Sequence, residues 1–176
     1  MQTLKIQMLS RWKRLLLILG PYAQTGPLGA FFLGISSGFP FALIGATLTT
    51  RLAQEGISKS SVTAFALTFL AYNFKPLWAP IVDNITLPMI GQFGQRRSWL
   101  WFVSFLLICS IVSLGVADPS QAIVMVAISA IAVGISGATL DIIIDAYRIE
   151  LLEPHQLGVG SGMSQYGWRI GAASAG

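Results

Sequence analysis

The sequence predicts an all-α bundle of transmembrane helices, and three observations lead to this class. Of the 176 residues, 54% are hydrophobic and only 10% are charged, whereas an average soluble domain carries about 25% charged residues. Eleven Lys and Arg and seven Asp and Glu are too few to cover the surface of a water-soluble protein. Charge-free stretches of roughly the 20 residues that cross a bilayer core separate these charges. Lipid is therefore the expected solvent.

Proline and glycine positions divide the apolar sequence into about five expected spans. Gly-Pro pairs at positions 20–21 and 26–27 break an uncharged stretch, so the first helix is expected to start near residue 27. Lys75 interrupts the second span, whereas the third is uncharged throughout. Asp118-Pro119 predicts a turn and the N-cap of the fourth helix. The predicted spans are 27–50, 60–83, 98–117, 121–147 and 157–176.

Basic residues near the ends of the spans predict the orientation of the chain. The N-terminal flank has four Lys and Arg, and the successive loops have two, two, none and one. Because basic segments resist translocation, this alternation predicts a cytoplasmic N-terminus. We expect residues 1–26 to form a basic cytoplasmic or interfacial segment with Trp12 as a headgroup anchor, and residues 27–176 to form the membrane bundle.

Small residues recur on one face of three predicted helices. Gly34, Gly38 and Gly45 share a face of the first span, because successive helical residues are about 100° apart. Such faces favour close helix packing, which is the simpler explanation of the glycines, or they border a water-filled cavity. The other two faces consist of Gly134, Gly137 and Ala138 on the fourth span and of Gly158, Gly162, Gln165, Arg169 and Ala172 on the fifth.

Charged residues inside the predicted spans are the strongest functional signal. A charge at the bilayer centre costs at least about 2.5–3.5 kcal/mol, so such a residue is a functional candidate. At a rise of 1.5 Å per residue, Lys75 lies roughly 12 Å and Asp141 roughly 10 Å from the expected cytoplasmic surface. These matching depths allow the two to pair, and Asp83 and Arg148 form a second matched level. Arg169 is also deep in its span.

Two interpretations of these charges remain open. In the first interpretation, Lys75 pairs permanently with Asp141 and Asp145 pairs permanently with Arg148, and these ion pairs hold the bundle together. Alternatively, a carboxylate takes up a proton and its cationic partner is released to an anionic substrate. The cost of burial favours function for Lys75 and Arg169, whereas Asp145 and Arg148 lie near the interface and leave the choice balanced.

Several motifs together resemble a known family. Asp83 followed by Gly94-Gln95-Arg96-Arg97 is similar to the loop between spans two and three of the major facilitator superfamily. Five further stretches occur in the matching order and resemble the AmpG-type muropeptide permeases and the related acetyl-CoA transporter group. These stretches are GISSGFP (34–40), KPLWAPIVD (75–83), RRSW (96–99), DIIIDAYRIELL (141–152) and YGWRIG (166–171).

The resemblance implies a proton-driven importer of anhydromuropeptides across the bacterial inner membrane. It also implies twelve or more spans in two pseudo-symmetric halves, with the substrate bound between them near the midplane. About five spans correspond to the N-terminal six-helix half, so we expect either a fragment or a short protein that pairs with a second half-transporter. The expected partners are the lipid bilayer, protons and a small anionic solute, and no cofactor is expected.

The resemblance further implies roles for individual residues. The candidates for proton coupling are Asp141 and Asp145. The candidates for gating are Asp83, Arg96, Arg97 and Arg148. The candidates for substrate binding are Lys75, Arg169, Gln165 and Asn73. Cationic side chains suit this last role, because the carboxylates of a muropeptide need charged partners in a partly desolvated cavity.

Other function classes fit the sequence less well. The formal charge of +4 does not indicate a nucleic-acid binder, since four basic residues fall in the first fourteen positions, where they set topology. An enzyme is not expected, because His155 is the only histidine and no His-Glu-x-x-His, Cys-x-x-Cys or Gly-x-Ser-x-Gly pattern occurs. No metal site is expected either. The remaining rival is a membrane scaffold that does not transport.

Overall fold

The computed structural model describes residues 13, 15, 16, 18–58, 62, 65–88, 91 and 94–176, and the regular elements among them are all helical. This confirms the predicted all-α class for that part of the chain. Lys13 is exposed, whereas the other basic residues of the predicted N-terminal segment and its anchor Trp12 lie outside the described residues. Three helical stretches are long and apolar enough to cross a membrane. They are Thr25–Gln54, Gln95–Val116 and Ile123–Leu151, and they correspond to the first, third and fourth predicted spans.

The first span is helical throughout but changes its winding midway. It consists of α2 (Thr25–Ala42), a π-helical turn (Leu43–Leu48) and α3 (Thr49–Gln54). Pro40 lies inside α2 and has no N–H to donate, and the wider π turn begins three residues later. Single π-helical turns inside α-helices often occur at functional sites.

The second predicted span is not one continuous helix, which corrects the expectation for residues 60–83. Residues 59–61, 63 and 64 lie outside the described residues. Phe74 and Trp78 each stand two residues before a proline, and their ψ angles of 1° and −3° leave the α-helical range. The two prolines therefore divide this stretch into short helices. In order they are a 3-10 helix (Ala66–Phe69), α5 (Leu70–Phe74), a 3-10 helix (Lys75–Leu77) and α6 (Ala79–Asn84).

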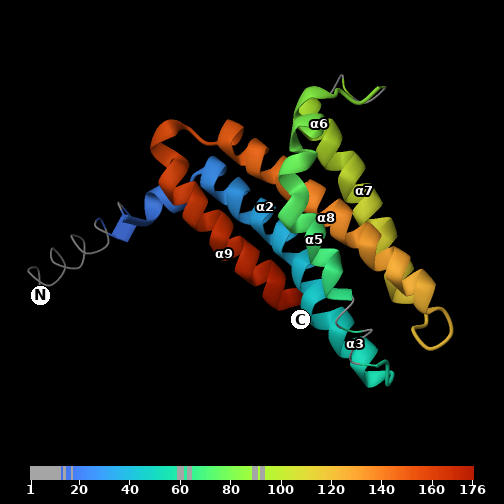
Figure 1. Cartoon of the computed structure of the whole chain (residues 1–176). Coiled ribbons are helices and arrows are strands. Elements are labelled where there is room, and N and C mark those ends of the chain that lie inside the picture. Colours follow the sequence, from blue (N-terminus) through green and yellow to red (C-terminus); the bar gives the residue numbers. More distant parts are fainter. Residues whose placement is uncertain are drawn as a thin grey trace, which may run out of the picture.

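The helices α7 (Gln95–Val116) and α8 (Ile123–Leu151) pack against each other in antiparallel orientation (Figure 1). Gly94 is the N-cap of α7 and has a φ of 99°, a conformation that favours glycine. At the other end of α7, the guanidinium of Arg51 donates to the carbonyls of Leu114 and Ala117 at 2.9 and 2.8 Å. These last carbonyls have no partner within the helix, so Arg51 attaches the end of the first span to the end of α7.

The loop between α7 and α8 contains the predicted Asp118-Pro119 turn. The amide and hydroxyl of Ser120 donate to Oδ1 of Asp118 at 2.9 and 2.8 Å, which confirms the turn. The predicted N-cap role of Asp118 is wrong, because α8 begins at Ile123 with Ala122 as its N-cap and without a side-chain cap. Asp118 lies too far from the helix start, and its carboxylate is used within the loop.

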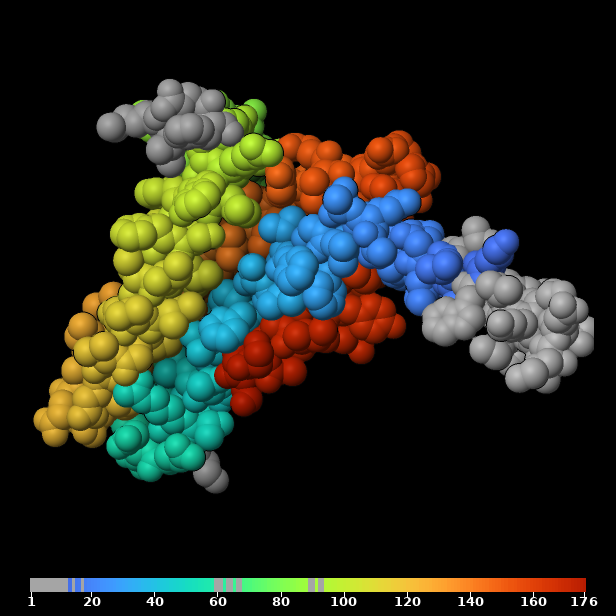
Figure 2. All heavy atoms as spheres, turned by 180° about the vertical axis from the view of Figure 1, so that it is seen from behind, coloured from blue at the N-terminus to red at the C-terminus, as the bar shows by residue number. Residues whose placement is uncertain are grey.

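The helix α9 (Leu157–Ala175) runs parallel to α2 with the two backbones in close contact (Figures 1 and 2). A Cβ atom at Gly34 or Gly38 would overlap the main chain of α9. A Cβ atom at Gly167 or Gly171 would overlap the main chain of α2. The expectation of close packing at Gly34 and Gly38 is therefore confirmed, since only glycine permits this approach.

On α9 the two glycines of the predicted face do not pack against another helix, whereas Gln165 of the same face borders a polar cavity. Gly158 and Gly162 face open space. Two stripes of small residues run along this helix, so spacing alone cannot choose between them, and the complementary glycines of α2 decide. The residues that are buried on α9 are Gly160, Ser164, Gly167 and Gly171.

α8 is the central helix of the bundle. Half of the most apolar 18-residue stretch of α8 is buried inside the protein, compared with 17% of the corresponding stretch of α7. Val126, Val133 and Ile143 of α8 are fully buried in a core shared with α7 and the π-helical turn. The exposed side of α7 is apolar, with Trp101 and Phe105 among its residues, as expected for a helix that faces lipid.

Candidate functional site

Four charged side chains meet between α8 and the broken second segment, and we call them the inner charge cluster. They are Lys75, Asp141, Asp145 and Arg148. The ammonium of Lys75 lies 2.5 Å from a carboxylate oxygen of Asp141 and 3.7 Å from one of Asp145. The guanidinium of Arg148 lies 3.2 Å from the other oxygen of Asp145. The predicted pairing of Lys75 with Asp141 is thereby confirmed.

Local backbone geometry brings these four groups together. Asp141, Asp145 and Arg148 are spaced four and three residues apart, so they lie on one face of α8. Lys75 begins a 3-10 helix directly before Pro76, where the second segment leaves the α-helical winding of α5. The irregular backbone is tolerated here because it packs against protein and borders a polar cavity.

Two serine hydroxyls extend the cluster to the α2–α9 pair. Ser37 of α2 donates to Oδ1 of Asp141 at 2.5 Å. Arg148 donates through Nη1 to the hydroxyl of Ser164 on α9 at 3.0 Å. Both serines are buried. The cluster therefore links α2, α8, α9 and the second segment through direct polar contacts.

The inner charge cluster borders a cavity of about 280 Å³. Two cations and two carboxylates give the cluster a formal charge of zero, which lowers the cost of placing it within a membrane bundle. Side-chain exposure of the four ranges from 19% for Arg148 to 47% for Asp145, so an ion or solute can reach them. The residues that line the cavity besides the cluster are Gly34, Ser37, Ile144, Ser164, Gln165 and Trp168.

An aromatic cluster adjoins Trp168, which lines this cavity. The ring of Phe41 lies 4.9 Å from Phe69, 5.3 Å from Tyr72 and 5.5 Å from Trp168, measured between ring centroids. These rings come from α2, the second segment and α9. The hydroxyl of Tyr72 is buried and has no hydrogen-bond partner among the described residues.

A second polar group, the end cluster, lies where the second segment meets α7 and the last turn of α8. It consists of Asp83, Gln95, Arg96 and Glu150. Arg96 forms ion pairs with Asp83 and, at 3.0 Å, with Glu150. Gln95 donates to the Asp83 carbonyl, and Arg97 is exposed without a polar side-chain partner in the described part of the chain. Asp83 therefore pairs with Arg96, whereas Arg148, expected at the level of Asp83, pairs with Asp145.

The remaining predicted residues lie outside both clusters. Gln165 lines the inner cavity. Arg169, one turn further along α9, is exposed, and so is Asn73 in α5. For these two the structure gives no polar contact within the described residues, so their assignment to substrate binding stays a prediction.

Sequence reasoning missed three contacting residues. Ser37 lies between Gly34 and Gly38, and Ser164 lies between Gly160 and Gly167, so each looks like one more small packing residue. Their position on a glycine face was nevertheless a usable signal, because a hydroxyl there faces another helix. Glu150 was not singled out, because a charged residue near the end of a helix is common and gives no functional signal. Among the described residues, no group of three or more His, Cys, Asp or Glu could hold a metal ion.

Comparison with known proteins places the chain among membrane transporters. The family described as "Acetyl-coenzyme A transporter 1" matches residues 28–131. A "Putative transporter AmpG 4" of Rickettsia felis is 34% identical over 80% of this chain and 34% of its own length. The "Anhydromuropeptide permease" of Escherichia coli K12 is 34% identical over 82% of this chain and 29% of its own length. The chain thus spans about a third of the length of these relatives.

The matched region includes α2, the broken segment, α7 and the first part of α8, and the pairwise matches cover most of the chain. The family profile alone covers more than half of the residues. The chain therefore belongs to the acetyl-CoA transporter and AmpG family of the major facilitator superfamily, which is a family of transporters and not of enzymes.

Proposed function

We propose that this chain forms the N-terminal bundle of a proton-coupled permease that imports a muropeptide or a similar anionic solute. The carrying observation is the inner charge cluster, in which Lys75 contacts two carboxylates inside an otherwise apolar bundle. In this proposal residues 27–176 form about five spans of a major-facilitator half, with α9 as the fifth. The bundle lies in the inner membrane with the N-terminus in the cytoplasm.

Charge balance supports coupling of the solute to a proton. The inner charge cluster is neutral when both carboxylates are ionised. Protonation of Asp141 would leave Lys75 without its nearest counter-ion and give the cluster a charge of +1. A monoanionic group of the solute then restores neutrality by pairing with Lys75, so proton and anion enter together. Asp145 is the second carboxylate within reach of Lys75 and is proposed to share this coupling role.

Neighbouring residues fit supporting roles in the same proposal. Gln165 lines the cavity and is placed to bind polar groups of the solute, with Arg169 and Asn73 further along the exposed face. Arg148 joins α8 to α9 through Ser164, which suits a gating residue that transmits binding of the solute from one helix to the other. The end cluster with Arg97 is proposed to steady one access state.

A half-transporter subunit, inactive without a partner, is the second candidate function. Arg169 is exposed on α9, and an unpartnered arginine facing hydrocarbon costs at least about 2.5 kcal/mol. This face therefore needs a protein or water to cover it.

Uptake by proteoliposomes tests both candidates. The chain is reconstituted, a pH gradient with the acidic side outside is imposed, and uptake of a labelled anhydromuropeptide is measured. Asp141→Asn is expected to abolish the gradient-driven part of the uptake while the protein stays folded by size-exclusion chromatography. Asp118→Asn is the matched control, because Asp118 is an exposed loop carboxylate remote from the cavity.

Each outcome decides between the candidates. Gradient-driven uptake by the intact chain supports the permease. Absence of uptake by the folded chain favours the half-transporter or a scaffold. If Asp141→Asn keeps both the rate and the pH dependence of the intact chain, Asp141 is not part of the proton coupling.

A further inference from the structure

We propose that the hydrogen bond from Trp78 to Thr139 is a positioning contact that holds Lys75 against Asp141. The indole Nε1 of Trp78 donates to Oγ1 of Thr139 at 3.2 Å. The Thr139 hydroxyl donates in turn to the Ile135 carbonyl at 2.7 Å, which fixes its direction. Neither Trp78 nor Thr139 belongs to the inner charge cluster, so they act on it through Lys75. The inference rests on the proposed role of the Lys75–Asp141 pair in proton coupling.

The backbone around Lys75 cannot fix its own position. Pro76 and Pro80 remove two helical N–H donors within five residues, and the segment passes from a 3-10 helix through a turn into α6. The amide of Trp78 donates to the Lys75 carbonyl at 3.3 Å, so these two residues share one turn. The height and rotation of Lys75 therefore depend on what this turn contacts outside itself.

Lys75 and Trp78 provide the polar contacts of this turn to α8. Within the described residues, the side-chain hydrogen bonds and ion pairs from residues 65–84 to α8 involve these two alone. Thr139 is buried and stands two residues before Asp141, while Trp78 stands three residues after Lys75. Both bonds thus join the same two backbones within about one helical turn. Loss of the Trp78 bond frees the turn to shift along α8.

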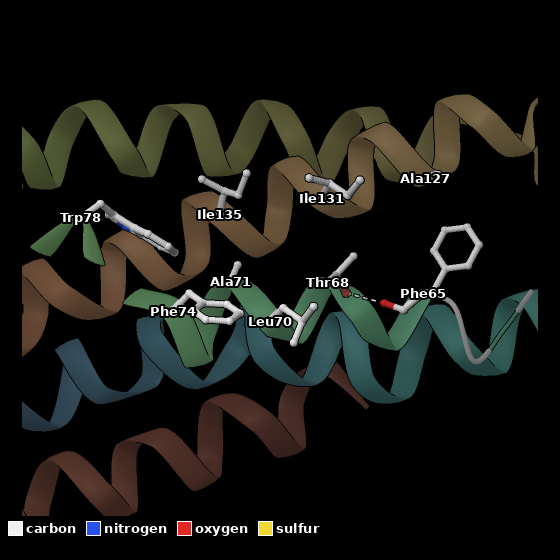
Figure 3. A pocket seen from close by; sticks show the side chains of 9 residues that line it. All are labelled: Phe65, Thr68, Leu70, Ala71, Phe74, Trp78, Ala127, Ile131 and Ile135. Carbon is white, nitrogen blue, oxygen red and sulfur yellow. Dashed lines mark hydrogen bonds between the residues drawn. The ribbon is translucent and has the colours of Figure 1, made fainter. Parts of the chain in front are cut away.

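Packing alone does not fix the Trp78 ring. It lies at one end of an open apolar groove of about 540 Å³ between the second segment and α8, with Phe65 at the opposite end (Figure 3). Trp78 packs against the buried core on one side and borders the groove on the other, so its position is less determined than that of a core side chain. The directed N–H bond to Thr139 supplies the missing constraint.

Reactivity of Lys75 tests the positioning role directly. The purified chain is treated with an N-hydroxysuccinimide ester, and acylation of Lys75 is followed by mass spectrometry relative to exposed Lys13. Trp78→Phe keeps a ring but removes the donor, and Thr139→Val removes the hydroxyl. Both are expected to raise the relative Lys75 rate about threefold, because an ammonium less firmly held by a carboxylate loses its proton and reacts more readily. Thr139→Ser keeps the hydroxyl and is expected to show the Lys75 acylation rate of the intact chain.

Trp99→Phe is the matched control. Trp99 donates through its indole to the Ile85 carbonyl at 2.7 Å and does not contact α8 through that bond. Its substitution makes the same chemical change without touching the turn that holds Lys75. An unchanged Lys75 rate in Trp78→Phe and Thr139→Val, or an equal rise in Trp99→Phe, would overturn the proposal.

Uptake measurements separate this inference from the proposed function. If both hold, Trp78→Phe raises the KM for the anionic solute at an unchanged amount of folded protein, and Thr139→Ser behaves like the intact chain. If the intact chain shows no uptake but the acylation pattern is as expected, the positioning role stands and the transport proposal fails. If uptake is present and Lys75 reactivity does not change, the positioning role fails and the transport proposal stands.

Discussion

The α2–α9 interface and the contact between residues 65–84 and α8 hold the same bundle together in different ways. In the first, glycines bring two main chains into direct contact, and the helices run side by side for most of their length. In the second, a broken backbone meets a regular helix through side chains, with Lys75 and Trp78 as its polar contacts. The open groove beside Trp78 belongs to the second contact.

The difference explains where the charges lie. An interface of touching main chains has no room for a side chain to move, so it serves as a rigid frame. A contact made by long side chains can exchange one partner for another, as Lys75 can between Asp141 and Asp145. Ser37 and Ser164 connect the two regions, because each lies on the rigid pair and bonds to the cluster.

The largest expected effect follows from breaking the rigid pair with Gly38→Ala. The new Cβ would overlap the Trp168 carbonyl, and main-chain atoms cannot move aside as a side chain can. We expect a loss of about 3 kcal/mol in the free energy of unfolding, at the upper end of overpacking effects. Thermal unfolding of the detergent-solubilised protein measures it.

Gly162→Ala is the control for this change. It adds the same methyl group to α9 at a position with open space, and alanine favours the helix, so stability should be equal or slightly higher. Equal destabilisation by both substitutions would mean that the glycines matter through backbone flexibility and not through close contact.

A smaller effect is expected from breaking the side-chain contact with Lys75→Met and Asp141→Leu. Each single change leaves a charge in the bundle without its nearest partner, at a cost of about 2 kcal/mol, less than for a fully buried pair because water reaches the cluster. The double mutant should be more stable than the sum of the singles predicts, by at least about 1 kcal/mol. Thermal unfolding of all four proteins measures this coupling.

Lys75→Met combined with Trp99→Phe serves as the control cycle, since these residues do not share a contact partner among the polar contacts described. Its changes should add. If Lys75→Met and Asp141→Leu are also additive, the two side chains do not stabilise the bundle as a pair, and the comparison of the two regions loses its basis.

The sequence predicted the contacts that depend on spacing along one helix. Asp141, Asp145 and Arg148 share one face of α8, as helical periodicity predicted. Gly34 and Gly38 were identified as a close-packing face for the same reason. These features need no knowledge of the neighbouring helix.

Features that depend on a partner helix were not predictable in this way. The face of α9 that packs is chosen by the glycines of α2, and both faces of α9 carry small residues. The breaks at Phe74 and Trp78 depend on how far each proline disturbs the preceding turn, which sequence spacing does not specify. The Trp78–Thr139 bond depends on those breaks.

The smallest expected effect comes from Asp118, which lies in the α7–α8 loop outside both regions. Hydrogen bonds from the hydroxyl and the amide of Ser120 hold the pKa of Asp118 below its ordinary value of 3.8. The unfolded chain therefore binds more protons near that pH, so the stabilisation is complete above about pH 3.8 and is lost as pH falls through the folded pKa. Acid titrations that are meant to report on the inner charge cluster should therefore stay above about pH 3.8, where Asp118 does not contribute to the change in stability.

Ser120→Ala tests this contribution because it removes the hydroxyl donor and keeps the amide donor. The intact chain should be slightly more stable than Ser120→Ala at pH 6, and the difference in melting temperature should shrink as the pH is lowered to 3. Ser110→Ala removes a hydroxyl that bonds a carbonyl of its own helix, so its effect should not change with pH. A Ser120→Ala difference that stays constant over this range would show that the hydroxyl acts without the charge of Asp118. A loss of stability in acid would then have to arise at other carboxylates.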